Sequence, residues 1–269
     1  SLAFEDKTPG GLFNITTFKA TSFDLIILFW YSTLSSDVTE VPTSATLPLT
    51  LIRPFWINCS HPLLEPTPAA ARNFMQKTVD NILYKDNKDL IWFLNHDHIY
   101  TCGTSSNKKE IINKTSIPII KTNRGGKTTY HGPGQRIVYF MINLNKRKKD
   151  VRNFITVIEK SLIEFLNIYN IDCRTYKDRV GIWVTGKNGK KFSREEKIGA
   201  IGLRLKKWIT YHGLSFNINP DMHNYDFIKA CGLDNFKNTS LKELGIHIKE
   251  KKFDKEFAKI FLKNLKHFK

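Results

Sequence analysis

The sequence of 269 residues contains no long hydrophobic run. A membrane-spanning helix needs about 18 or more consecutive apolar residues, whereas the longest apolar stretch of the N-terminal region is Leu25–Tyr31. We therefore predict that the protein has no membrane span. Its hydrophobic residues, 41% of the total, are still numerous enough to bury a substantial core.

Cysteine is scarce as well, and the four cysteines lie far apart in the sequence, at Cys59, Cys102, Cys173 and Cys231. They form no Cys-x-x-Cys pair and no cysteine–histidine pair at zinc spacing, so we expect no metal. A chain of this length needs no disulfide bonds to fold, and we expect reduced thiols. Cys59, Cys102 and Cys173 are predicted to be structural.

Acidic residues are few, 25 against 42 lysines and arginines, which gives a net charge of +17. Such a charge favours an anionic partner, whether nucleic acid, a membrane surface or an acidic protein. The basic residues are dispersed, however, and no aromatic–basic RNA motif is present. We predict no nucleic-acid partner and keep a nucleic-acid-binding protein as the alternative from another class. The basic run at residues 146–149 is interpreted as a solvated loop, with a docking patch for an acidic protein as its alternative.

Residues 1–50 differ from the rest because they are rich in Ser and Thr and show no clear periodicity. We interpret them as a poorly structured N-terminal extension or the remnant of a targeting segment. Residues 51–269 are predicted to form a single domain, because no internal repeat or linker interrupts them.

Apolar residues at helical spacing predict three helices in this domain. The first begins at the cap signal Thr67-Pro68, the second covers Val151–Tyr169 and the third covers Phe253–His267. A short helix is expected at Asp226–Ala230. Strands are predicted at Leu90–Leu94, Ile117–Ile120, Ile137–Leu144, Val180–Val184, Ile198–Leu205 and Trp208–Ile218. Because helices and strands do not alternate regularly, we predict an α+β fold with a mixed, largely antiparallel sheet flanked by helices.

One glycine-rich segment, Arg124–Gln135, lies between two of the predicted strands and reads Arg-Gly-Gly-Lys-Thr-Thr-Tyr-His-Gly-Pro-Gly-Gln. Its glycines allow the backbone to approach a ligand closely. Successive N–H groups can then hold an oxygen anion or a polarised carbonyl, and Arg124, Lys127 and His131 add side-chain donors. An ordinary turn explains a loop of this length and composition poorly.

Two weaker segments carry a candidate amine and a candidate thiol. Lys197 opens the predicted strand Lys-Ile-Gly-Ala-Ile-Gly, and Cys231 lies in Ala-Cys-Gly-Leu. Taken alone, Lys197 is a solvated surface lysine and Cys231 an inert buried cysteine. The functional interpretation of either residue depends on the segments being read together.

These segments occur in an order that resembles the lipoyl(octanoyl) transferases. The order is His96–Gly103, Arg124–Gln135, Lys197–Gly202, His212–Ser215 and Cys231–Leu233. The resemblance covers roughly residues 57–245 and implies that 51–269 is a catalytic domain with the fold shared by biotin- and lipoate-protein ligases. It also implies transfer of an octanoyl or lipoyl group from acyl carrier protein to a lysine. That lysine belongs to a lipoyl domain of a 2-oxoacid dehydrogenase or to the H protein of the glycine cleavage system.

The resemblance implies Cys231 as the nucleophile and Lys197 as its partner. Transfer of an acyl group from a thioester to an amine is easier in two steps through an acyl-enzyme. A free cysteine has a pKa near ~8.5, so a nearby lysine ammonium would stabilise the thiolate and act as general acid and base. The implied substrate-binding residues are Arg124, Gly125, Gly126, Lys127, Thr128, Thr129, Tyr130, His131, Ala200, Ile201, Gly202, Gly213, Leu214 and Ser215. Since the conversion of a thioester into an amide is thermodynamically favourable, no ATP and no metal are expected as cofactors.

The sequence departs from the family pattern at three places. Ala230 replaces a common Pro, Thr104 replaces a common Arg, and residues 187–196 look like an insertion. The insertion brings Lys190 and Lys191 close to Lys197 in the sequence, but only Lys197 precedes Ile-Gly-Ala-Ile-Gly.

Two alternatives remain within the fold, an ATP-dependent lipoate or biotin ligase and an inactive homologue that only holds an acyl chain. For localisation we expect a plastid (apicoplast-like) or a mitochondrion, with the cytoplasm as the alternative.

Overall fold

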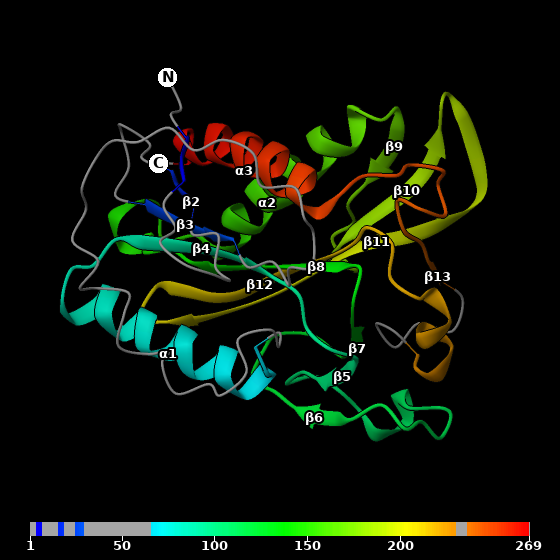
Figure 1. Cartoon of the computed structure of the whole chain (residues 1–269), viewed down its shortest axis with the longest axis horizontal. Helices are drawn as coiled ribbons and strands as arrows, with labels where there is room; N and C mark the ends of the chain where they lie inside the picture. The colour runs from blue at the N-terminus through cyan, green and yellow to red at the C-terminus, as the bar shows by residue number, and fades with distance from the viewer. Residues whose placement is uncertain (1–3, 7–15, 19–24, 30–65, 230–235, 269) are drawn as a thin grey trace.

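The computed structural model describes residues 4–6, 16–18, 25–29, 66–229 and 236–268 (Figure 1). Cys59 and Cys231 lie outside these residues. An eight-stranded sheet forms the centre, in the order β3-β4-β8-β12-β11-β10-β9, with β13 beside β11. Its strands are β3 (Leu25–Phe29), β4 (Asp89–Leu94), β8 (Gln135–Met141), β9 (Ile171–Arg174), β10 (Ile182–Lys187), β11 (Lys190–Lys206), β12 (Ile209–Asn217) and β13 (Lys237–Asn238).

The pairing in this sheet is antiparallel except between β3 and β4 and between β11 and β13. A second sheet of three strands, in the order β6-β5-β7, lies beside it (Figure 1). Its strands are β5 (Ile99–Cys102), β6 (Ile119–Lys121) and β7 (Thr128–His131), and a separate pair is formed by β1 (Phe4–Asp6) and β2 (Thr16–Phe18). The prediction of a mixed, largely antiparallel sheet is confirmed.

Helices cover both faces of the central sheet (Figure 1). They are α1 (Pro68–Tyr84) on one face and α2 (Val151–Asn167) and α3 (Glu250–Lys266) on the other, with short 3₁₀ helices η2 (Lys108–Glu110), η3 (Leu144–Lys146) and η4 (Met222–Phe227). The Thr67 hydroxyl caps α1 by accepting from the N–H of Ala70 at 3.2 Å, as the sequence predicted. Because β4 lies between the two helical layers, all six of its residues are buried.

Two predicted elements need correction. The strand expected to continue to Leu144 ends at Met141, and residues 144–146 form η3 instead. The helix expected at Asp226–Ala230 is instead the end of η4, which stops at Phe227. At Ile228 the chain already forms a bridge to Ile111, so backbone pairing replaces the helix; Ala230 lies outside the described residues.

The predicted boundary after residue 50 also needs correction. The apolar residues Leu25–Phe29 form β3, and all five of them pair in parallel with β4. Leu25 and Ile27 are buried in the core against α2 and α3. An apolar, β-branched segment fits the open edge of β4, so these residues are part of the main sheet and not of an unstructured extension.

The helix α3 is tied to the sheet by a buried ion pair. The guanidinium of Arg136 on β8 donates two hydrogen bonds to the carboxylate of Asp254, at 2.9 and 2.7 Å, and both side chains are fully buried. It donates a third to Asn95 at 2.7 Å, and Asn95 in turn donates to Glu250 at 2.6 Å. This pair fixes the start of α3 against the ends of β4 and β8.

Removing one partner of this pair should be costly. Replacement of Asp254 by Ala leaves the buried guanidinium without its carboxylate, and we expect the free energy of unfolding to fall by about 3–5 kcal/mol. Urea denaturation measures the loss. Glu164→Ala is the matched control, because it removes the partially exposed Lys263–Glu164 pair between α3 and α2 and should cost at most about 1 kcal/mol. Equal losses in the two variants would contradict the special role of Arg136.

Candidate active site

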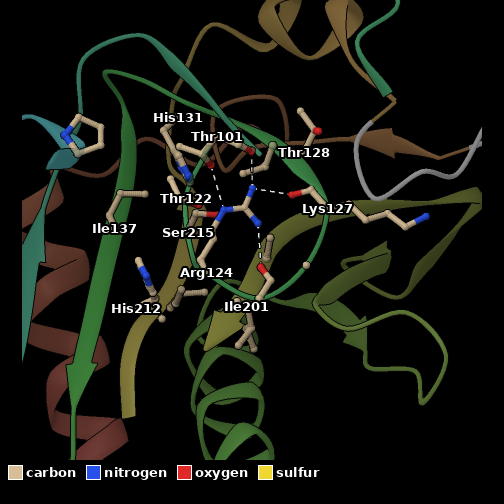
Figure 2. Close-up of a pocket in the computed structure, with 18 of the residues that line it drawn as sticks. Thr101, Thr122, Arg124, Lys127, Thr128, His131, Ile137, Ile201, His212 and Ser215 are labelled. Carbon is tan, nitrogen blue, oxygen red and sulfur yellow. Dashed lines mark hydrogen bonds between the residues drawn. The ribbon is translucent and has the colours of Figure 1, made fainter. Parts of the chain in front are cut away.

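A cavity of about 650 Å³ lies where the small sheet meets the large one. It is lined by α1, by β5, β6, β7, β8, β11 and β12, by the segment between β6 and β7, and by the turn before β10. Figure 2 shows residues that line it. The predicted site residues that line it are Arg124, Gly125, Gly126, Lys127, Thr128, Thr129, His131, Lys197, Ala200, Ile201, Gly202, Gly213, Leu214 and Ser215. The structure thus brings together segments that are up to 91 residues apart in sequence, as Arg124 and Ser215 are.

Tyr130 is the predicted substrate-binding residue that does not line this cavity. It lies on β7 between Thr129 and His131, and successive side chains of a strand point to opposite faces. Its ring is fully buried against Tyr100 and Ile228, and its hydroxyl bonds to His98 Nδ1 at 2.6 Å. The side chain of Tyr130 therefore lies in the core behind β7 and does not reach the cavity.

The segment Arg124–Gln135 is not one loop, because it contains β7 and the first residue of β8. Its turn is held by Arg124, whose guanidinium donates to the carbonyls of Thr101 and Lys127, both at 2.6 Å, and of Gly125 at 2.9 Å (Figure 2). A further bond joins its Nε to Thr101 Oγ1 at 3.0 Å. Most of the N–H donors of Arg124 therefore hold the backbone of this turn in place.

The turn also approaches β11 so closely that neither backbone tolerates a side chain. A Cβ atom on Gly125 would lie 2.9 Å from the carbonyl oxygen of Leu203, and one on Gly202 would lie 2.8 Å from the carbonyl oxygen of Gly125. Two of the glycines noted in the sequence are thus explained by contact between backbones and not by a turn alone.

Lys197 is buried, with 5% of its surface exposed, and lines the cavity. Its Nζ donates to the carbonyl of Val180 at 3.0 Å and lies 5.3 Å from the centre of the Trp183 ring. Lys190 and Lys191 lie at the start of β11, beyond the tight turn at Asn188 and Gly189, and both are exposed. Of these three lysines only Lys197 reaches the cavity, which supports the predicted register.

Gly181 determines where the amine of Lys197 can lie. A Cβ atom on Gly181 would be 2.6 Å from Lys197 Cε and 3.1 Å from its Nζ. The backbone of Gly181 also has a φ of 133°, which side chains with L configuration rarely adopt. A glycine is therefore required beside this lysine.

Three histidines on the cavity are held neutral. Burial lowers the pKa of His96 to about 4. Burial, and next to it the charge of Arg124, lowers the pKa of His131 and of His212 to about 3. His96 Nδ1 lies 3.0 Å from the carbonyl of Pro66 and donates to it, so its Nε2 accepts from the hydroxyl of Tyr139 at 2.8 Å. These rings act as hydrogen-bonding groups and not as acids at neutral pH.

His131 is oriented by a buried polar network that extends to η4. Its Nδ1 donates to Gln135 Oε1 at 2.6 Å. The amide nitrogen of Gln135 donates to Asn217 Oδ1 at 2.9 Å and to the hydroxyl of Tyr225 at 2.8 Å. The network thereby connects the cavity wall to the helix that precedes residues 230–235.

Several lining residues were not anticipated from the sequence. Tyr139 follows Ile137 on the same face of β8, so strand periodicity could have found it. Met75 reaches the cavity from α1, and the residues 178–180 reach it from the turn before β10. No pattern in the sequence marks these, because they meet the site only through tertiary packing.

The remaining functional expectations concern thiols, metals and membranes. Cys102 and Cys173 are free thiols, and burial raises the pKa of Cys173 to about 12, which fits a structural cysteine. Among the described residues, no three His, Cys, Asp or Glu side chains gather as ligands for a metal ion. None of the helices in the described part of the chain is long and apolar enough to cross a bilayer.

Replacement of Gly181 by Ala should displace the amine of Lys197 from the Val180 carbonyl. We expect Lys197 to react severalfold faster with an amine-labelling reagent, as measured by peptide mass spectrometry. Gly189→Ala is the control, since Gly189 has a φ of 74° but nothing within 4 Å of its Cβ position; both variants bear backbone strain of about 1–2 kcal/mol. Unchanged labelling in folded Gly181→Ala would overturn this assignment.

The three neutral histidines predict a loss of stability in acid. Their folded pKa values lie below the ordinary value of 6.5, so the unfolded chain binds more protons between about pH 4 and 6.5. The free energy of unfolding should therefore fall as the pH drops below 6.5, by up to ~1.4 kcal/mol per pH unit for each histidine. Denaturant titrations between pH 6.5 and 5 measure the slope. His212→Gln should reduce it by about 1 kcal/mol per pH unit, and an unchanged slope would show that His212 is not neutral.

Comparison with known proteins gives the family. The model of the lipoyl protein ligase A/B catalytic domain matches residues 67–262. The octanoyltransferase of Wolbachia sp. subsp. Brugia malayi is 45% identical over 196 residues, covering 71% of this chain and 93% of the relative. The octanoyltransferase of Rickettsia canadensis is 42% identical over 195 residues, covering 70% and 90%.

Solved structures agree in fold. Lipoate-protein ligase A bound with ATP matches with a TM-score of 0.54 at 15% identity, over 72% of this chain and 81% of that one. The bipartite lipoate protein ligase of Thermoplasma acidophilum matches with a TM-score of 0.52 at 14% identity, over 72% and 80%. The predicted ligase-type fold is confirmed, and the chain belongs to the lipoyl protein ligase A/B catalytic-domain family, among the octanoyltransferases.

Proposed function

We propose that the protein transfers an octanoyl group from acyl carrier protein to a lysine of a lipoyl domain, through a thioester on Cys231. The observation that carries this proposal is the buried amine of Lys197 on the wall of a cavity, in a chain whose relatives are octanoyltransferases. Because burial of a lysine without a role is rare, its placement beside a partly apolar chamber points to chemistry on an acyl group.

The cavity suits an acyl chain. Ile137, Ile201 and Leu214 give it an apolar surface, and each of them comes from a different strand of the central sheet. Burying a methylene group contributes about 0.8 kcal/mol, so an eight-carbon chain gains affinity from such a wall. The Gly125–Gly126 backbone lies on the same cavity and offers polar groups for the carbonyl end.

The thiol partner is supported by the anchors on both sides of residues 230–235. On one side, the N–H of Lys229 donates to the carbonyl of Glu110 at 2.7 Å, and the carboxylate of Glu110 accepts from the N–H of Thr128 at 2.8 Å. On the other side, Asn238 pairs with Lys197 in parallel register. Both anchors adjoin the cavity wall, in keeping with a role for Cys231 there.

The proposed mechanism has two steps. The Cys231 thiolate, stabilised by the ammonium of Lys197, attacks the thioester of octanoyl-acyl carrier protein, and Lys197 protonates the departing thiol. The lysine amine of the acceptor then attacks the new thioester, and Lys197 takes the proton released from that amine. The first step exchanges one thioester for another and the second is downhill, so we propose that neither ATP nor a metal takes part.

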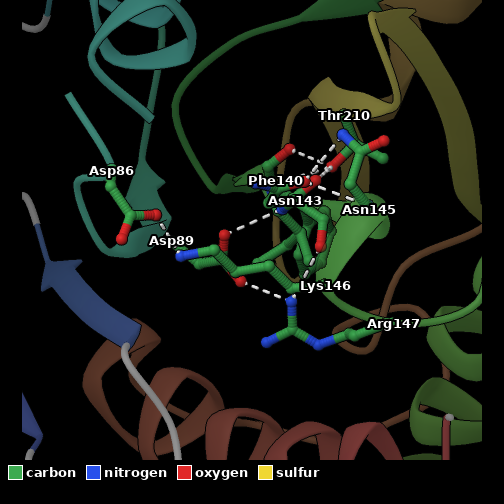
Figure 3. A network of polar contacts seen from close by, with 9 residues as sticks. Asp86, Asp89, Phe140, Asn143, Asn145, Lys146, Arg147 and Thr210 are labelled. Carbon is green, nitrogen blue, oxygen red and sulfur yellow. Dashed lines mark hydrogen bonds and ion pairs between the residues drawn. The ribbon is translucent and has the colours of Figure 1, made fainter. Parts of the chain in front are cut away.

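An acidic donor protein fits the charges around the cavity. Arg72, Lys121 and Lys127 line it, and all three are exposed. The run 146–149 is a weaker docking surface, because Lys146 is paired with Asp86 and Arg147 with Asp89 (Figure 3). We therefore place the docking of acyl carrier protein at the cavity mouth.

The acceptors proposed are the lipoyl domains of 2-oxoacid dehydrogenases and the H protein of the glycine cleavage system. This proposal rests on the family, whose model is that of the lipoyl protein ligase A/B catalytic domain. A plastid or mitochondrial location gains no support from the relatives, which are bacterial and fit the alternative of the cytoplasm.

The decisive test is acylation without ATP. Incubation with octanoyl-acyl carrier protein alone should add one octanoyl group to the protein by intact mass, and Cys231→Ala should abolish the adduct. Lys197→Ala should reduce its rate by a factor of at least about 100. Lys190→Ala is the control, since Lys190 is exposed and remote from the cavity; it should acylate normally.

Two results would reject the proposal. An adduct that forms only with ATP and free octanoate would indicate a ligase of the same fold. Full transfer to a lipoyl domain by Cys231→Ala would exclude the covalent route.

A further inference from the structure

The charged groups on the cavity have nearly all one sign. The cationic side chains that line it are Arg72, Lys121, Arg124, Lys127, Arg179 and Lys197. Within the described part of the chain, Asp178 is the one carboxylate on its wall. Asp178 is exposed, so a molecule that enters the cavity can reach it.

Asp178 belongs to the turn that holds the amine of Lys197. Val180, two residues further on, accepts the hydrogen bond from Lys197 Nζ at 3.0 Å. Gly181 makes room for the end of the same side chain. One short turn therefore presents a carbonyl to Lys197 and a carboxylate to the cavity.

The neighbouring residue Arg179 is not paired with the Asp178 carboxylate. Arg179 forms an ion pair with Glu195 on β11, and its guanidinium lies over the rings of Tyr176 at 3.8 Å and Trp183 at 4.4 Å. No hydrogen bond or ion pair to the Asp178 carboxylate is found among the residues that the structure describes. Asp178 is thus an exposed residue on the cavity wall without a partner among the described residues.

The two substrates of the proposed reaction differ in the charge that they bring to this place. The octanoyl thioester is uncharged, whereas the acceptor lysine arrives as an ammonium, since lysine has an ordinary pKa of about 10.4. A wall of cations repels that ammonium, and a single carboxylate attracts it. The acceptor ammonium therefore needs a carboxylate on the cavity wall, whereas the uncharged donor thioester does not.

We propose that Asp178 is the binding residue for the ammonium of the acceptor lysine. This inference rests on the proposed function. The ammonium bound at Asp178 gives one proton to solvent, and the resulting neutral amine attacks the acyl carbon of the enzyme thioester. The C–N bond forms as the C–S bond breaks, Lys197 takes the second proton, and the sulfur leaves as the thiolate that the Lys197 ammonium stabilises. Asp178 takes no proton in this sequence; it holds the acceptor beside Lys197.

The two half-reactions test this assignment separately. In Asp178→Asn, formation of the octanoyl adduct from octanoyl-acyl carrier protein should proceed at the wild-type rate. Transfer from the preformed adduct to a lipoyl domain should show a KM about tenfold higher with a nearly unchanged maximal rate. Asp178→Glu should recover part of the loss. Asp172→Asn is the matched control, because Asp172 is an exposed aspartate on β9 that does not line this cavity.

A third measurement separates charge recognition from damage to the site. Hydroxylamine is an amine nucleophile that is uncharged at neutral pH, and it should cleave the adducts of wild type and Asp178→Asn equally fast. Equal transfer to the lipoyl domain by both proteins would overturn the inference. A parallel slowing of acylation, hydroxylamine cleavage and transfer would also overturn it, because Asp178 would then act on Lys197. Absence of any adduct in wild type would instead reject the proposed function.

Discussion

The buried ion pair between Arg136 and Asp254 is the constraint on which the arrangement of the site depends. A buried charge is tolerated only with its partner and its hydrogen bonds in place, so α3 has a single position against β8. The neighbouring residue Gln135 points to the opposite face of the same strand and orients His131. One dipeptide thus fixes the helix layer on one side and the cavity wall on the other. Asn95, which accepts a hydrogen bond from Arg136, links the end of β4 to the same ion pair.

The cavity itself is shaped by contacts between backbones more than by its side chains. Gly125 and Gly202 allow the turn after β6 to touch β11, and the guanidinium of Arg124 supplies the donors that hold that turn. The same cation lowers the pKa of His131 and of His212, next to the effect of burial. A positively charged wall and neutral imidazoles are therefore two results of one interaction, and both make the cavity favourable to an electron-rich carbonyl.

The sequence predicted those features that depend on local patterns. The cap at Thr67 and the buried strand β4 are each encoded in a few adjacent residues. The contact between the backbones of Gly125 and Gly202 was not predicted, because the two residues lie far apart in the sequence. The position of the Tyr130 side chain could not be predicted, because a motif does not state which face of a strand its members occupy; the alternation of β7 turns this side chain into the core. The strand β3 was missed because its partner β4 lies 60 residues further along the chain. Asp178 was missed for the same reason, since only folding brings its turn to Lys197.

The way in which Lys197 is held bears on how one amine could serve two steps. The carbonyl of Val180 is neutral, so it fixes the position of Nζ without cancelling its charge, and the ring of Trp183 favours a cation at this place. A carboxylate bonded in that position would weaken the field on a thiolate and would compete for the proton. With Asp178 in the same turn but exposed on the cavity wall, the fold separates the group that orients the catalytic amine from the group that we infer attracts the substrate amine. The amine of Lys197 and the amine of the acceptor lysine can then meet at one acyl group, because they do not compete for the same carboxylate.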